Sequence, residues 1–210
     1  LGQLGLGGSY YASNGGRTNV GEVFVKQGFV QFNRLGPSTL KLGRFEFFDG
    51  VEAAVPDPVV ARIVQTRIVH RLVSNFGFTA AQRSFDGAQW RLANGPHTVN
   101  VLAMRPTQGV FQADGMKGLD VDLGFASYNH VTNSAHYAST LRLFGIGYMD
   151  HRTSVAKTDN RPAAARTADH DEVSIGTVGG NYVARVATRS GPVDFLVWGV
   201  GQFGSWGVQT

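Results

Sequence analysis

The sequence predicts an all-β fold whose antiparallel strands run up and down along the chain. Three observations support this prediction: apolar and polar residues alternate with period two, 28 glycines accompany 14 phenylalanines, and Gly-Pro turn signals recur. With 42% hydrophobic and only 16% charged residues, the chain is too apolar to be a disordered segment. Its 210 residues suit a single domain.

The alternation predicts nine strands. Within 119–125, for example, Leu119, Val121 and Leu123 share one face, whereas Asp120 and Asp122 share the other. The nine expected strands cover about 1–11, 20–34, 39–48, 78–92, 97–105, 118–128, 136–149, 171–188 and 193–206.

Short and long connections alternate between these strands. Tight turns are expected at the Gly-Pro pairs, because glycine supplies the turn geometry and proline cannot donate to a strand ladder. The short turns lie at 35–38, 94–96, 129–135 and 190–192, and the long connections at 12–19, 49–77, 106–117 and 150–170. In an up-and-down sheet, this order places all short turns at one end and all long loops at the other.

One short helix is expected inside the longest of these loops. Apolar residues recur at helical spacing between Asp57 and Leu72, and Asp57-Pro58 is a good start signal. This helix would carry three basic side chains, Arg62, Arg67 and Arg71. It would either pack on the rim of the sheet, fold into a pore as a constriction, or contact lipopolysaccharide phosphates.

Sorted turns and loops are typical of transmembrane β-barrels of the outer membrane, and barrels close because an unpaired strand edge is costly in hydrocarbon. Nine is an odd number, whereas single-chain bacterial barrels have even numbers of strands. The last residues, 208–210, also lack a terminal aromatic side chain. We therefore expect residues 1–210 to be part of a single, larger barrel domain.

Composition excludes several classes of function. The chain has no cysteine, which rules out disulfides, cysteine zinc sites and thiol catalysis. Its net charge of +4 comes from dispersed basic residues, which argues against nucleic-acid binding. No apolar run is long enough for a transmembrane helix, and the absence of an initial methionine suggests a processed chain or a fragment. We expect no cofactor and no catalytic activity.

Three short motifs resemble a known family. They are Leu40 to Glu46 (LKLGRFE), Gln82 to Ala88 (QRSFDGA) and Gly201 to Gly207 (GQFGSWG). Together they resemble the alginate-export family of outer-membrane porins, over about residues 20–207. The resemblance implies a barrel of 16–18 strands in the bacterial outer membrane, which passively conducts anionic or polar saccharides. It also implies contact with outer-membrane lipid and lipopolysaccharide, and leaves any periplasmic export partner unidentified.

Charged residues on the strands are the candidate pore lining. An arginine-rich lumen concentrates anions and binds uronate carboxylates through the planar guanidinium group. The candidates are Arg44, Glu46, Arg83, Asp86, Arg91, Arg105, Asp120, Asp122, Arg142 and Arg185. Alternatively, Arg44, Glu46 and Arg83 would form a salt-bridge network that braces the wall, and each of the other arginines would lie on a solvated face. Asp86 reaches a lumen only if a bulge at Gly87 reverses the strand register.

Two functions of other classes remain open. The first is a soluble carbohydrate-binding module that uses Trp90, Trp198 and Trp206 as stacking platforms. The second is a barrel-type outer-membrane hydrolase, although the six histidines form no HExxH motif and no nucleophile elbow. The acidic segment 169–172 is either a cation site or an exposed loop.

Overall fold

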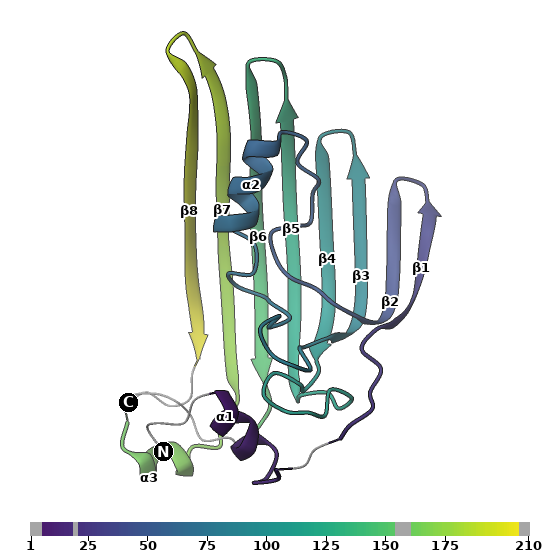
Figure 1. Ribbon diagram of the computed structural model, residues 1–210, viewed down its shortest axis with the longest axis vertical. Coiled ribbons are helices and arrows are strands. Elements are labelled where there is room, and N and C mark those ends of the chain that lie inside the picture. Colours follow the sequence, from purple (N-terminus) through teal and green to yellow (C-terminus); the bar gives the residue numbers. More distant parts are fainter. Residues whose placement is uncertain (1–5, 19–20, 154–160, 206–210) are drawn as a thin grey trace.

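The computed structural model describes residues 6–18, 21–153 and 161–205, which form one antiparallel sheet and three short helices (Figure 1). The strands lie in sequence order, so each pairs only with its neighbours in the chain. They are β1 Gly28–Leu35, β2 Ser38–Phe45, β3 Phe85–Asn94, β4 His97–Pro106, β5 Val121–Asn133, β6 Tyr137–Asp150, β7 Val173–Thr188 and β8 Gly191–Ser205. The helices are α1 Leu6–Ser13, α2 Pro58–Arg67 and α3 Ala163–Ala168.

The prediction of an all-β, up-and-down fold is confirmed, but the sheet has eight strands rather than nine. Its first expected strand was wrong: within 1–11, the described residues begin the helix α1. Helical structure is unexpected there because Leu6–Ser13 contains two glycines and two tyrosines, which have low helix propensity. The two edge strands, β1 and β8, do not pair with each other, so the sheet is open.

The sorting of turns and loops is confirmed. The four hairpin turns all lie at the end of the sheet shown at the top of Figure 1, and the three long connections lie at the other end. We call these the turn end and the loop end. Gly36 and Gly95 have φ angles of +64° and +55°, a region that side chains rarely adopt, so glycine is needed in both tight turns.

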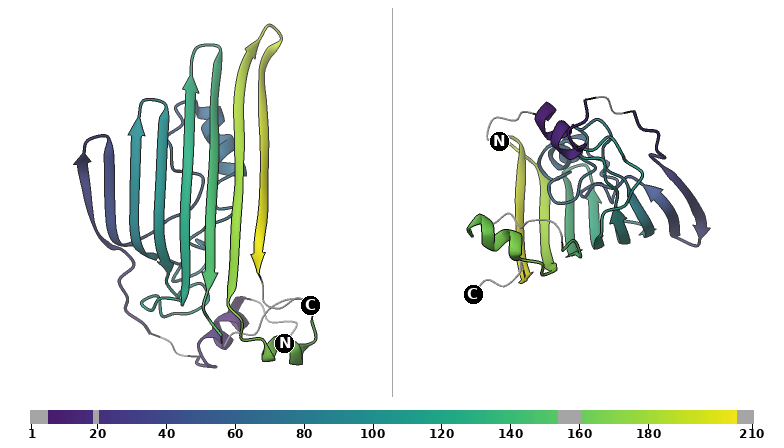
Figure 2. Two further views of the ribbon diagram at one scale, coloured as in Figure 1. Left: turned by 180° about the vertical axis from the view of Figure 1, so that it is seen from behind. Right: turned by 90° about the horizontal axis from the view of Figure 1, so that it is seen from below.

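The long β2–β3 connection folds back over one face of the sheet. Figure 2 shows this connection and α2 on the same face. The expected helix is confirmed over Pro58–Arg67, but it ends before Leu72, so Arg71 lies beyond it. Asp57 caps the helix by accepting hydrogen bonds from the backbone N–H groups of Val59 and Val60, and Pro58 occupies its first turn. We call the face that carries this connection the covered face, and the opposite one the open face.

The hydrophobic core lies between the covered face and the β2–β3 connection. Toward the loop end, aromatic and aliphatic side chains of β2 to β6 surround Phe47 and Val73 of the connection; those in the strands are Phe45, Phe85, Leu102, Met104, Phe125 and Phe144. Toward the turn end, Val60 of α2 packs on Ala138 and Val183. Among the described residues, no helix is long and apolar enough to cross a membrane.

Candidate functional site

The structure divides the predicted pore-lining residues between the two faces of the sheet. Residues paired across neighbouring strands point to the same face, so the strand register assigns each position. Arg91, Arg142 and Arg185 lie on the covered face. Arg44, Asp86, Arg105 and Asp122 lie on the open face. Glu46, Arg83 and Asp120 lie just outside the strands, at the loop end.

A buried arginine joins the β2–β3 connection to the wall of the sheet. Arg142 of β6 donates two hydrogen bonds to the Glu52 carboxylate, at 2.7 Å from Nη2 and 3.1 Å from Nε. Both residues are buried, and the guanidinium also lies over the rings of Phe125 and Phe144. A bidentate pair in this setting fixes position as well as charge. Arg142 is therefore part of a structural salt bridge rather than of a solvated face.

Two further residues complete this contact. Arg91 of β3 donates from Nε to the Glu52 backbone oxygen at 3.2 Å, and the Asp49 carboxylate lies 3.6 Å from Arg142 Nη2. Asp49 also accepts hydrogen bonds from the backbone N–H groups of Leu72 and Val73, which closes the connection on itself. Burial raises the pKa of Asp49, although these two hydrogen bonds oppose the shift. We call Asp49, Glu52, Arg91 and Arg142 the loop anchor.

The sequence did not identify the two acids of the loop anchor. Asp49 and Glu52 flank Gly50, in a stretch that looks like an ordinary polar turn. Only the folding of the connection onto the sheet brings Glu52 to Arg142, 90 positions away. The one available signal was Arg142 itself, a lone arginine between Leu141 and Leu143 of β6.

A polar hollow lies on the covered face beside the open edge at β1. It has a volume of about 190 Å³ and is lined by Gln31 of β1, Thr39 and Lys41 of β2, and Gln89 and Arg91 of β3. Amide and hydroxyl groups together with two cations suit a polar or anionic ligand rather than an apolar one. Of these five residues, sequence reasoning identified only Arg91. Lys41 was hidden because it sits between leucines in the LKLGRFE motif.

Arg83 is a second cation with an unusual environment. Its Nε donates to the Thr107 backbone oxygen at 3.1 Å, and its guanidinium lies 5.0 Å from the centre of the Phe76 ring. Within the described part of the chain, no carboxylate lies at ion-pair distance from it. Burial, with a smaller contribution from the neighbouring Arg152, lowers the pKa of Arg83 to about 10. It remains charged at neutral pH and lies at the loop end of the sheet.

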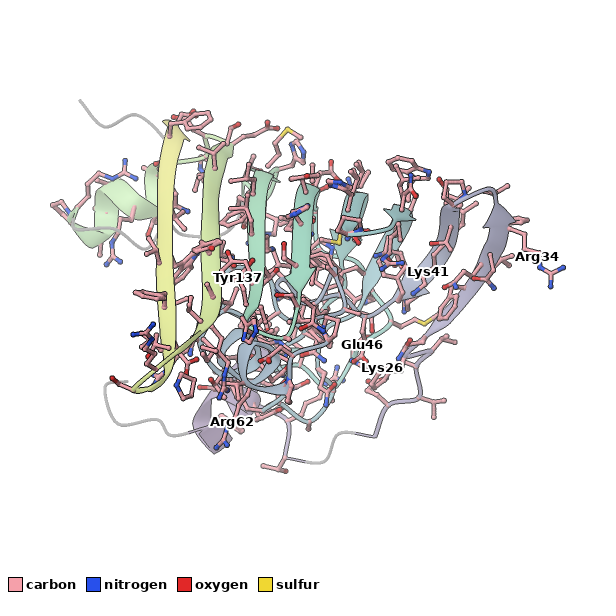
Figure 3. All side chains as sticks on the ribbon, turned by 90° about the horizontal axis from the view of Figure 1, so that it is seen from above. Lys26, Arg34, Lys41, Glu46, Arg62 and Tyr137 are labelled. Carbon is pink, nitrogen blue, oxygen red and sulfur yellow. The ribbon has the colours of Figure 1, made fainter. Side chains whose placement is uncertain are left out.

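Glu46 pairs with a lysine rather than with Arg44 or Arg83. Its carboxylate lies 3.2 Å from Lys26 Nζ and accepts a hydrogen bond from Asn75. Figure 3 shows Glu46 and Lys26 next to each other. This pair ties the segment before β1 to the β2–β3 connection.

On the open face, the charged residues form two ion pairs near the loop end. Arg44 donates two hydrogen bonds of 2.7 Å to Asp86, and Arg105 donates to Asp122 at 2.9 Å. Asp120 lies 3.5 Å from Arg105. The expectation that Arg44 shares a face with Arg91 and Arg142 was wrong. Phe45, the residue after Arg44, points to the covered face because the folded β2–β3 connection supplies the apolar partners Phe47 and Val73 there.

The bulge predicted at Gly87 is absent. Phe85 to Leu92 pair with β2 and β4 without a register shift, so Asp86 stays on the same face as Ala88 and Trp90. Arg44 neutralises the carboxylate, which removes the need for the bulge. Gly87 has a different role: a Cβ atom there would lie 2.2 Å from the Ala103 backbone oxygen, so only glycine lets β3 and β4 approach.

The middle of the open face is apolar and exposed. Large hydrophobic side chains from both edges and the centre of the sheet reach solvent there, among them Phe32, Leu42, Trp90, Val101, Leu143, Val178, Phe195, Val197 and Phe203. Tyrosine and histidine side chains follow at the turn end, from β4 to β7: His97, Tyr128, His130, Tyr137 and Tyr182. The open face thus runs from ion pairs, through an apolar band, to amphipathic aromatic residues.

The residues proposed for the alternative functions do not come together. Trp90 lies on the open face and Trp198 on the covered face, so these two rings do not form one stacking surface; Trp206 lies outside the described residues. In the acidic segment, Asp169 pairs with Arg161 and Glu172 with His151. The described residues contain no group of three or more potential metal ligands of the His, Cys, Asp or Glu type.

A single serine–histidine contact bears on the hydrolase hypothesis within the described chain. His70 Nδ1 lies 3.2 Å from Ser74 Oγ, in the β2–β3 connection. The Ser74 hydroxyl already accepts a hydrogen bond from the Phe76 backbone, and the His70 ring stacks on Phe48. A nucleophile–base pair needs a third group that orients the base. The stacked ring and the occupied hydroxyl suit a local structural contact better.

No protein-family model matches the chain, and comparisons with characterised proteins and with solved structures find no match.

Proposed function

We propose that this chain forms part of the wall of an outer-membrane β-barrel that passively conducts anionic or polar saccharides. In this proposal the open face contacts lipid and the covered face lines the lumen. The observation that carries it is the exposed apolar band of the open face, to which every strand except β5 contributes a large apolar side chain, and which lies between ion pairs and aromatic side chains. A soluble protein rarely exposes so large an apolar surface, whereas a membrane barrel needs one.

The order of residues along the open face supports the same assignment. Transmembrane barrels carry aromatic girdles where the membrane meets water, and tyrosines and histidines gather at the turn end of this face. The strands β3 to β8 have 10 to 16 residues, enough for a tilted span of about 9–11 residues. The open edges at β1 and β8 would pair with further strands, as an edge in hydrocarbon requires.

In this arrangement the β2–β3 connection lies inside the lumen, where it narrows the passage. The loop anchor holds it against the wall through Arg91 and Arg142, so these two arginines act first as structural contacts. The polar hollow with Lys41, and Arg83 at the loop end, which has no carboxylate at ion-pair distance among the described residues, are the groups left to attract anions. Four of the candidate residues would lie outside the lumen, at the membrane boundary nearest the loop end: Arg44, Asp86, Arg105 and Asp122.

The test is the conductance of the full-length protein in planar lipid bilayers. We expect steady channels that prefer anions, and a shift in migration on boiling in detergent, as intact barrels show. Polyuronate added to one side should reduce the current. A protein that stays soluble without detergent and binds saccharide would overturn the proposal in favour of a carbohydrate-binding module.

A matched pair of variants tests the assignment of the lumen. Lys41→Gln removes a cation from the polar hollow and should lower both anion preference and block by polyuronate. Arg34→Gln removes the same charge at the turn end of β1, where the side chain points away from the sheet (Figure 3), and should change neither. Equal effects of the two substitutions would contradict a lumen on the covered face.

A further inference from the structure

Two histidines at the turn end of the open face lie opposite each other on β4 and β5. His97 and His130 are paired directly in the strand register, on the open face at the turn end. Their Nδ1 atoms are 3.4 Å apart and their ring centres 4.8 Å apart. His97 is exposed and His130 half-buried, so both rings are accessible from solvent.

This separation matches that of two ligands on one metal ion. Imidazole nitrogens bind zinc at about 2.0–2.1 Å. An ion at that distance from both Nδ1 atoms, held 3.4 Å apart, would subtend an angle of about 110°, close to the tetrahedral value. Neither backbone would need to move, because small rotations of the two rings bring their lone pairs to a common point.

Two neighbouring side chains contact the ring nitrogens. Thr132 Oγ1 lies 3.4 Å from Nε2 of His130, so it can accept a hydrogen bond from a protonated Nε2, the tautomer in which Nδ1 is free to bind metal. The Tyr128 hydroxyl lies 2.8 Å from Nδ1 of His97 itself, so its oxygen is close enough to coordinate an ion bound there once its hydrogen bond to that nitrogen is given up.

We propose that His97 and His130 bind a divalent late transition-metal ion through their Nδ1 atoms, with water or the Tyr128 oxygen in the remaining positions. Imidazole suits copper, nickel and zinc, and affinity rises toward copper. Two protein ligands leave the ion open to exchange, so the site would take up and release metal rather than hold the fold together. The proposal does not depend on the transport function.

The test uses Cu²⁺ and Zn²⁺ salts alone, titrated into the folded, detergent-solubilised protein at about pH 7.5. Calorimetry should find one saturable site per chain, and electron paramagnetic resonance of the copper complex should show two coupled nitrogens. His97→Gln or His130→Gln should each weaken binding about 100-fold, because the second ligand acts at high effective concentration.

The control is His136→Gln, which removes an exposed histidine from the adjacent β5–β6 turn and should leave binding unchanged. All three positions are accessible, so unaltered circular dichroism should accompany each substitution. Tyr128→Phe tests whether the hydroxyl oxygen coordinates the metal. The substitution should alter the copper spectrum if the oxygen is a ligand, and leave it unchanged if water fills that position. Equal binding by the wild type and the His97→Gln/His130→Gln double variant, or one coupled nitrogen, would overturn the proposal.

Discussion

The two faces of this sheet differ most clearly at two adjacent residues of β6. Arg142 is buried on the covered face, where it binds Glu52 of the β2–β3 connection. Leu143 is half-exposed on the open face, among other apolar side chains. A cation is buried and an aliphatic side chain is exposed, the reverse of the usual arrangement in a soluble sheet. This arrangement is one of the observations that support the proposal of a lipid-facing open face.

The largest effect is expected from removing the buried cation. Arg142→Gln leaves the carboxylates of Glu52 and Asp49 buried without their counter-ion, and should lower the free energy of unfolding by about 3–5 kcal/mol. Urea denaturation measures the change. Arg185→Gln is the control, because its contact with Asp194 is long, at 4.0 Å, and partly exposed, and should cost about 0–1 kcal/mol.

A double variant keeps this prediction testable if Arg142→Gln does not fold. Replacing both members of the bidentate pair with apolar residues, as in Arg142→Met with Glu52→Leu, leaves only Asp49, which keeps its hydrogen bonds from the backbone of Leu72 and Val73, and should recover much of the lost stability. Loss of folding in the double variant as well would contradict the role assigned to the loop anchor.

A slightly smaller effect is expected on the open face. Leu143→Arg places a charge near the middle of β6, and should lower stability in lipid bilayers by about 2–4 kcal/mol if this face contacts hydrocarbon. In a soluble domain the same exposed substitution would change stability by less than about 0.5 kcal/mol. Gln89→Arg adds the same charge to the covered face, beside the polar hollow, and should be tolerated.

Two glycine positions compare the backbone packing of the covered face with that of the open face. Gly87→Ala forces a Cβ atom against the backbone of β4 and should cost about 1–3 kcal/mol, by overpacking. Gly124→Ala adds the same methyl group on the open face, where no atom lies within 4 Å, and should be nearly neutral. Thermal unfolding of both variants measures the difference. Similar costs would show that the β3–β4 spacing is not tight.

The smallest effect is a pH dependence at the loop end. Hydrogen bonds to Glu172 and Asp122 raise the pKa of His151 above its usual value of about 6.5. Protonated His151 therefore stabilises the fold below about pH 6.5, and this contribution is lost as the pH rises through the higher folded-state pKa. Denaturation at pH 5.5 and 8.5 should show a slightly larger difference for the wild type than for His151→Gln.

The sequence was informative about topology and poor at assigning faces. Gly-Pro pairs and two-residue alternation are local signals, and they predicted the hairpins and the sorted loops, while helical spacing after Asp57-Pro58 predicted the helix. Alternation also placed Arg142 and Leu143 on opposite faces of the sheet. It could not show that Phe45 faces inward, because that depends on where a 39-residue connection, 46–84, folds. Glu52, His97 and His130 gain their partners only through strand register and long-range contacts.

The pairing of every strand with its neighbour in the chain has a kinetic consequence. Four of the pairings, β1–β2, β3–β4, β5–β6 and β7–β8, close short turns at little entropic cost, whereas the other three close long connections, of which 46–84 is the longest. The contact between Glu52 and Arg142 instead joins residues 90 positions apart, and requires β3 to β6 to be in place first. The loop anchor should therefore form after the rate-limiting step of folding. Substitutions there would speed unfolding and leave the folding rate nearly unchanged.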